Sequence, residues 1–90
     1  MAAKKDTHVV VGVHITHRVE HASEVQRLFT EYGKHIKTRL GLNDMLGGKP
    51  GPSGLILLEM VGGEKAADAM IAKLREIKGV GCKKMVFEHR

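Results

Sequence analysis

The sequence predicts a single α+β domain whose strands and helices alternate in the order βαββαβ. Three observations lead to this prediction: four short segments with strand-like apolar patterns, two longer segments with helical spacing, and glycines at the joins between them. A chain of 90 residues has room for one domain with a thin core. Domains of this size often gain stability by self-association, so a homo-oligomer is expected.

The first strand is predicted over residues 7–16, because apolar residues there recur at every second position. The side expected to face the helices carries Val9, Val11, Val13 and Ile15. The opposite side carries His8, Val10, Gly12 and His14.

A helix is predicted over residues 19–32, where apolar residues are spaced three and four apart, with Gly33 ending it through a positive φ. Residues 35–42 alternate again, and this strand should place Ile36 and Leu40 on the same face, at an edge of the sheet. Residues 43–53 hold several glycines and two prolines, which predicts a loop that is neither helix nor strand.

The second half of the chain repeats the outline of the first half. Residues 54–61 are apolar on both faces except for Glu59, as in a central strand covered on both sides. Residues 64–77 have helical spacing, and Gly79 should end that helix. The last strand is predicted over residues 80–88.

These elements fold in few ways, because each βαβ crossover is right-handed and therefore places its helix on the same face of the sheet. The prediction is a ferredoxin-like, antiparallel four-stranded sheet with strand order 4-1-3-2 and two helices on one face. Residues 1–90 then form one domain, with an ordered core at about 7–88.

Composition excludes several classes of protein. The formal net charge of +5 is spread along the chain, which favours a solubilising surface over a nucleic-acid site, and no DNA-reading motif is recognisable. One cysteine excludes an internal disulfide, and the first residues lack the apolar run of a secretion signal, so a cytoplasmic protein is expected. No apolar run is long enough to cross a membrane.

The fold class hosts many functions, so particular residues must decide among them. The central strands lack the aromatic residues with which an RNA-recognition motif stacks bases. No cysteine pair is present for a soft-metal chaperone. Arg18 follows the first strand without the glycine-rich anion cradle of an acylphosphatase-like enzyme.

Several short segments in order carry a resemblance to a known family: 31–33 (EYG) leading into Ile36, 39–42 (RLGL), 54–62 (GLILLEMVG) and 79–80 (GV). The chain resembles the small ACT-like proteins of the iron-only hydrogenase system regulator family, which are similar in fold to the C-terminal domain of nickel-responsive repressors. The resemblance covers roughly residues 7–87. It implies a stand-alone ACT-like module that oligomerises and senses a ligand, and it supplies no catalytic residues.

Histidines give a second hypothesis, a site for a transition metal such as nickel. His14, His17 and His21 cluster where the first strand runs into the first helix, and imidazole is a common nickel ligand. The predicted sheet order brings His14 near Cys82, and the resemblance implies a mixed histidine and thiolate site. The alternative is that Cys82 lies in the core, as free cysteines usually do.

The leading interpretation is a non-catalytic regulatory module, a dimer or tetramer that buries the outer face of its sheet through Val10, Leu55 and Leu57. The resemblance to ACT-like dimers points to Gly12, His14 and Arg39 as ligand-binding positions. A small-molecule ligand and a regulatory protein partner are expected. The resemblance also implies a role in hydrogenase-related transcriptional regulation. A metal-responsive sensor and a small enzyme are the alternatives; no nucleophile with a partnered base supports the enzyme.

Overall fold

A computed structural model describes the backbone of residues 7–16, 18–46 and 49–88, and their side chains except those of 18–22, 42–46 and 49–53. The elements follow the predicted order. They are β1 (Thr7–Ile15), α1 (Arg18–Glu31), a short 3-10 helix (Gly33–His35), β2 (Ile36–Leu46), β3 (Lys49–Met60), α2 (Glu64–Leu74) and β4 (Val80–Glu88).

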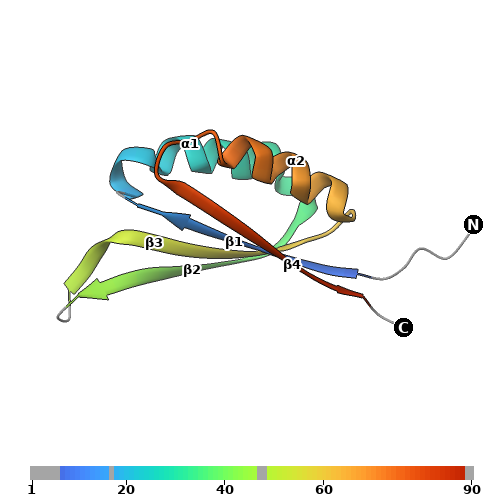
Figure 1. The fold of residues 1–90 in the computed structure, drawn as a ribbon, viewed down its shortest axis with the longest axis horizontal. Coiled ribbons are helices and arrows are strands. Elements are labelled where there is room, and N and C mark those ends of the chain that lie inside the picture. Colours follow the sequence, from blue (N-terminus) through green and yellow to red (C-terminus); the bar gives the residue numbers. More distant parts are fainter. Residues whose placement is uncertain (1–6, 17, 47–48, 89–90) are drawn as a thin grey trace, which may run out of the picture.

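The four strands form one antiparallel sheet in the order β2-β3-β1-β4, which confirms the predicted topology. Both helices lie on one face of this sheet, and the other face carries no helix (Figure 1). The first and last strands are neighbours along their whole length, from Thr7 opposite Glu88 to Ile15 opposite Val80.

The core lies between the helices and the sheet. Val9, Val11 and Val13 of β1 are at most 1% exposed, as the alternation predicted, and Leu58 of β3 is fully buried opposite Val11. Helix α2 adds Ala67, Met70 and Leu74, all fully buried. Burial of apolar surface at this one interface is the main stabilising contribution to the fold.

The ends of the helices differ in part from the prediction. Gly33 does not adopt a positive φ, because it begins a 3-10 turn that leads directly into β2. Helix α2 ends at Leu74 rather than at residue 77, and a turn follows that includes Gly79 at φ 85°. Gly62 and Gly63, at φ 93° and 84°, turn the chain from β3 into α2, a conformation that glycine adopts without steric cost.

A β-bulge lies in β2 between Ile36, which pairs with Met60, and Thr38, which pairs with Glu59. The extra residue, Lys37, reverses the alternation of side chains along the strand. Ile36 therefore packs against the core while Leu40 is 52% exposed on the other face. The prediction that these two residues share a face is wrong.

Within the predicted loop at residues 43–53, the described residues 43–46 and 49–53 are instead strand. β2 continues to Leu46 and β3 begins at Lys49, with Met45 opposite Pro50 and an irregular register near residue 43. This hairpin projects beyond β1, whose last partner in β3 is Gly54 opposite Ile15 (Figure 1). Proline is tolerated there because, past the end of β1, a residue of β3 has a neighbouring strand on one side only.

Within the described part of the chain, neither helix combines the length and the apolar character that crossing a membrane would require.

Candidate functional site

The face of the sheet opposite the helices, here called the outer face, is not covered by any helix of the described chain (Figure 1). Strand pairing places Leu40, Leu57, Gly12 and Lys83 in one row across the four strands. Val10 pairs with Met85 and His8 with Phe87 in β4, which extends this face toward the chain ends. The even-numbered residues of β1 therefore point outward, as the sequence predicted.

Large apolar side chains stand exposed on the outer face. Leu40, Met85 and Phe87 are 52%, 53% and 53% exposed, and Val10 and Leu57 are partly buried between them. At Gly12, a Cβ would lie 3.7 Å from Leu57 Cδ2, an ordinary van der Waals distance, so Leu57 lies beside the backbone of β1 at this position. The result is an apolar surface formed by three of the strands and extending to Leu40 on the fourth, with Glu59 of β3 and Lys83 of β4 as charged neighbours on the same face.

The three predicted ligand positions do not form one site. Gly12 and His14 lie on the outer face, whereas Arg39 pairs with the buried Leu58 and so lies on the helix side. There the Arg39 guanidinium carbon stands 4.9 Å from the centre of the Phe29 ring, a cation–π contact with α1. The bulge at Lys37 causes this separation, because it moves Arg39 to the opposite face.

The predicted metal ligands are also separated. Cys82 pairs with Val13 and is 7% exposed in the core, whereas His14 pairs with Gly81 and is exposed on the outer face. The two are close along the sheet but point to opposite sides of it, so the prediction that they share a site is wrong. His17 and the side chain of His21 lie outside the described residues. No group of three potential metal ligands occurs among the residues that are described.

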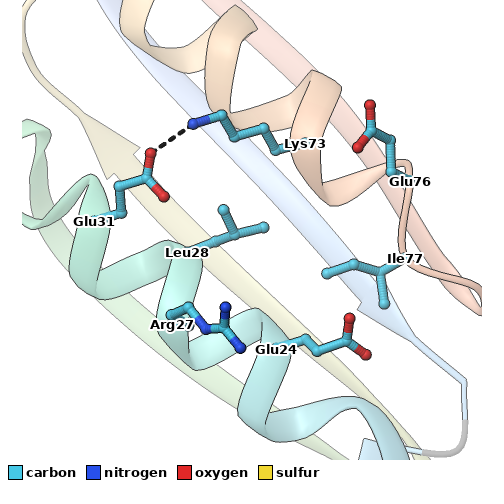
Figure 2. A pocket seen from close by; sticks show the side chains of 7 residues that line it. All are labelled: Glu24, Arg27, Leu28, Glu31, Lys73, Glu76 and Ile77. Atoms are coloured by element: carbon cyan, nitrogen blue, oxygen red, sulfur yellow. Dashed lines mark hydrogen bonds and ion pairs between the residues drawn. The ribbon is translucent and has the colours of Figure 1, made fainter.

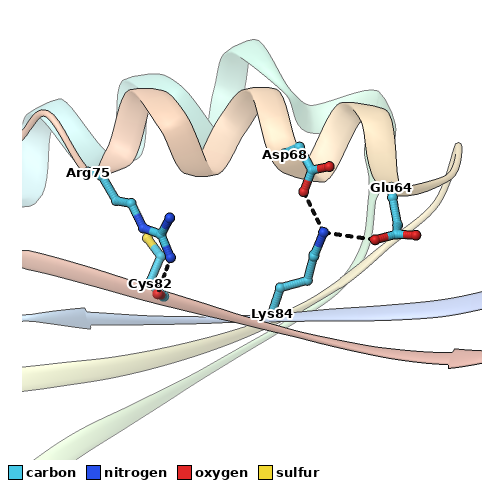
Figure 3. A network of polar contacts seen from close by, with 5 residues as sticks. All are labelled: Glu64, Asp68, Arg75, Cys82 and Lys84. Atoms are coloured by element: carbon cyan, nitrogen blue, oxygen red, sulfur yellow. Dashed lines mark hydrogen bonds and ion pairs between the residues drawn. The ribbon is translucent and has the colours of Figure 1, made fainter.

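Cys82 behaves as a core residue. Burial raises the pKa of its thiol above the ordinary value of 9.0, and the nearby positive charge of Arg75 offsets this only in part. The Arg75 side chain donates a hydrogen bond of 3.0 Å from Nη2 to the carbonyl oxygen of Cys82, at the open edge of β4 (Figure 3). A neutral, buried thiol is a poor nucleophile and a poor metal ligand.

A second polar contact ties β4 to α2 (Figure 3). Lys84 Nζ donates to Asp68 at 2.6 Å and to Glu64 at 2.8 Å, and these bonds raise the pKa of Lys84, Asp68 having the larger effect. Lys84 pairs with Val11 on the helix side of the sheet. Its ammonium group bridges the first two turns of α2, where acidic residues also suit the helix dipole.

An open groove of about 420 Å³ lies between the two helices, on the side away from the sheet (Figure 2). Leu28 and Ile77 contribute its apolar lining, and Lys73 of α2 bonds to Glu31 of α1 at 2.5 Å. Lys73 also stands 5.2 Å from the centre of the Tyr32 ring. The remaining charged residues along the groove are Glu24, Arg27 and Glu76. Mixed charges and a shallow form give this groove no marked preference for one ligand.

The apolar pattern predicted Val10, Leu55 and Leu57 on the outer face but not Met85 and Phe87, which are among its most exposed residues. The signal was present: in residues 80–88 the even positions hold Val80, Cys82 and Val86, so the odd positions should point outward. Leu40 was placed on the same face as Ile36 because a one-residue bulge leaves no mark in the apolar pattern.

Together, the βαββαβ order, the antiparallel sheet and the single helical layer define a ferredoxin-like α+β domain. Solved structures share this architecture. TM1266, an uncharacterized protein from Thermotoga maritima, has a TM-score of 0.74 at 19% identity, over 93% of this chain and 99% of that one.

A nitrogen regulatory PII-like protein, CPII from Thiomonas intermedia K12, is also similar. Its complex with ADP, AMP and bicarbonate has a TM-score of 0.64 at 9% identity, over 98% of this chain and all of that one. Its apo form has a TM-score of 0.63 at 10% identity, over 96% of this chain and 95% of that one. No protein-family model and no curated protein matches the sequence. At these identities the likeness establishes the shared fold.

Proposed function

We propose that this chain is a non-catalytic regulatory module that senses a small ligand and works as a homo-oligomer joined through its outer face. The observation that carries the proposal is the exposure of Leu40, Met85 and Phe87 on a sheet face without a helical layer. Contiguous exposed apolar side chains on a small domain usually mark an interaction surface. A second copy is the simplest partner, because a twofold axis lets the same surface serve both sides.

Regulation through ligand binding is supported by the fold and by the resemblance. CPII, which has this architecture, is described as a regulatory protein and is bound to ADP, AMP and bicarbonate in one structure. The sequence resemblance adds a finer proposal, a role linked to a hydrogenase system. A subunit boundary along the outer face would bring Gly12 and His14 of neighbouring copies together, whereas Arg39 lies on the other face.

The oligomer is tested by light scattering on the wild-type protein and on Val10→Lys, at micromolar concentration. The new charge would lie in the middle of the buried outer face, and taking it out of water there would cost free energy even with Glu59 opposite it on β3. Val10→Lys should therefore have a smaller mass than the wild type. The matched control is Ala69→Lys, which adds the same charge at an exposed position of α2. A monomeric wild type would refute the proposed assembly.

Ligand sensing is tested by calorimetric titration of the wild type with ADP, AMP and nickel, each alone. A heat of binding when a nucleotide is added to the wild type would support a nucleotide-responsive module, provided that the folded His14→Ala variant gives no such heat. Uptake of nickel that disappears in His14→Ala would favour the metal-responsive alternative. If none of the three binds, these ligand classes are excluded, and mass spectrometry of co-purified small molecules becomes the next measurement.

A further inference from the structure

The edge of the sheet at β4 is closed in its first half and open in its second. The N–H of Val80 donates to the carbonyl of Ile77 at 3.2 Å, and Arg75 occupies the carbonyl of Cys82 at 3.0 Å. Both backbone groups therefore point away from β1. Backbone groups alternate in direction along an antiparallel strand, so those of Lys84, Val86 and Glu88 also point outward. Within the described chain, no turn or side chain is bonded to the backbone of Lys84 or Val86 on that side.

The opposite edge is protected differently. β2 carries the bulge at Lys37, and Lys37 itself is exposed. A bulge is a common device that keeps an edge strand from pairing with another chain. Among the described strands, the second half of β4 is thus the straight, regular edge.

We infer that a second copy of this chain pairs antiparallel with β4 along residues 84–88, about a twofold axis at Val86. Two four-stranded sheets would then join into one continuous sheet. In this register, three residue pairs with outward backbone groups would exchange about six hydrogen bonds. The bonds at Lys84 and Val86 satisfy backbone groups to which no turn or side chain of the described chain is bonded.

Side chains fit this register on both faces. On the outer face, Met85 stands opposite the partner's Phe87, and both side chains are 53% exposed in one copy. On the helix side, Val86 meets its own copy, and Lys84 stands opposite the partner's Glu88. Lys84 has three N–H donors and uses two of them for Asp68 and Glu64, which leaves one for that carboxylate.

Other registers fit less well. An axis at Lys84 would oppose two lysines and would require the carbonyl of Cys82, which Arg75 already occupies. An axis at Met85 would place Lys83 opposite Phe87, and an axis at Phe87 would place Val86 opposite Glu88. Like charges directly opposite each other are destabilising, and a charged residue opposite an apolar one forms neither of the favourable cross-strand pairs, opposite charges or packed apolar side chains. Only the axis at Val86 pairs apolar Met85 with apolar Phe87 on the outer face and, on the helix side, pairs the oppositely charged Lys84 and Glu88.

This edge interface is separate from the outer-face interface of the proposed function. The edge joins sheets side by side, and the outer face stacks them. A molecule that uses both would contain four copies if the two twofold axes are perpendicular and intersect. Experiments can therefore support the edge interface while refuting the outer-face interface, or support the outer-face interface while refuting the edge interface.

The test combines a variant with a direct readout of the edge. In Val86→Pro the lost N–H is one that points away from β1, so the sheet of the single copy keeps its hydrogen bonds. Each partner loses one bond across the axis, and self-association should weaken by at least about tenfold. Sedimentation velocity would show about half of the wild-type mass. Val86→Ala, which loses packing but keeps the N–H, should keep the wild-type mass.

Amide hydrogen exchange by NMR gives the second measurement, on the wild type. The amides of Lys84 and Val86 should exchange more slowly as protein concentration rises. Those of Lys83 and Met85, which face β1, should be protected at every concentration. Concentration-independent exchange at Lys84 and Val86, or a wild-type mass for Val86→Pro, would overturn the edge pairing. In either case Val10→Lys would still report on the outer face alone.

Discussion

Arg39 and Cys82 both have clear structural roles on the helix side of the sheet. The Arg39 guanidinium covers the Phe29 ring at 4.9 Å, and Cys82 completes the core beside Val13. Neither residue needs a ligand to account for its position. A residue that looks functional in the sequence, such as a lone cysteine, is often explained by packing once its face of the sheet is known.

The raised pKa of the Cys82 thiol predicts a pH-dependent contribution to stability. Because burial favours the neutral thiol, the folded state holds this proton more tightly than the unfolded state does. The contribution is therefore complete below the ordinary pKa and is lost as pH rises from about 9 through the raised folded value. Denaturant unfolding from about pH 8 to about pH 10 should show a steeper loss of stability in the wild type than in Cys82→Ala.

The same burial predicts slow chemistry at this thiol. At about pH 8, alkylation of Cys82 should be much slower in the folded protein than in urea, because the thiolate is the reactive form. Equal rates in the two conditions would contradict a buried, protonated thiol. Both measurements need only the wild-type protein and the single variant.

At the scale of elements, the junction between β3 and α2 is tightly constrained. Gly62 has a φ of 93°, and a Cβ there would lie 2.7 Å from His35 Nδ1. The contact arises because the Val61 N–H donates to the His35 carbonyl at 2.7 Å, which draws the 3-10 turn against the end of β3. Glycine at this position thus serves both the backbone angle and the close approach.

Gly62→Ala should destabilise the protein by about 1 to 3 kcal/mol, because alanine is strained at a positive φ and its methyl group would displace His35. Urea unfolding measures the loss. In Gly62→Ala with His35→Ala, the clash is removed but the backbone strain is not, so only part of the stability should return. Gly41→Ala is the control, since a Cβ there has nothing within 4 Å and φ is not positive. A neutral Gly62→Ala would contradict this account of the turn.

Most elements could be predicted from the sequence because each has a clear apolar period. The alternation at Val9, Val11 and Val13 placed β1, and the apolar run at residues 54–61 placed the centre of β3. The hairpin over 43–53 was missed because its glycines and prolines resemble a loop, and its pairing depends on a partner strand rather than on local preference. The bulge at Lys37 was missed because it too depends on pairing with the neighbouring strand. The face on which Arg39 lies was therefore also predicted wrongly.

At the scale of the whole molecule, one face of a thin sheet is covered by two helices and the other is not (Figure 1). A domain of this size buries a modest fraction of its surface by itself, so a partner surface has a large effect on its stability. The sequence predicted which face of the sheet forms the candidate site and that Val10 points toward that face. The residues that are most exposed there, Met85 and Phe87, depend on the register between β4 and β1.

Self-association through the outer face predicts that thermal stability depends on protein concentration. For a dimer, a tenfold rise in concentration adds about 1.4 kcal/mol to the free energy of unfolding per dimer, which should raise Tm by a few degrees. Scanning calorimetry over a hundredfold range of concentration would measure this shift. Val10→Lys should melt at a lower temperature and show a smaller dependence. A wild-type Tm that stays constant would argue for a monomer.

The pairing of Thr7 with Glu88 has a consequence for how the chain folds. β1 is central in the sheet, yet one of its two neighbours is the last strand of the domain to be synthesised. Until that strand emerges, β1 presents an open row of backbone groups and its valines lack part of their cover. Contacts between the most distant parts of a chain form slowly, so folding should be completed late by the docking of β4. Nascent chains that stall before residue 80 would then be the species most prone to aggregate.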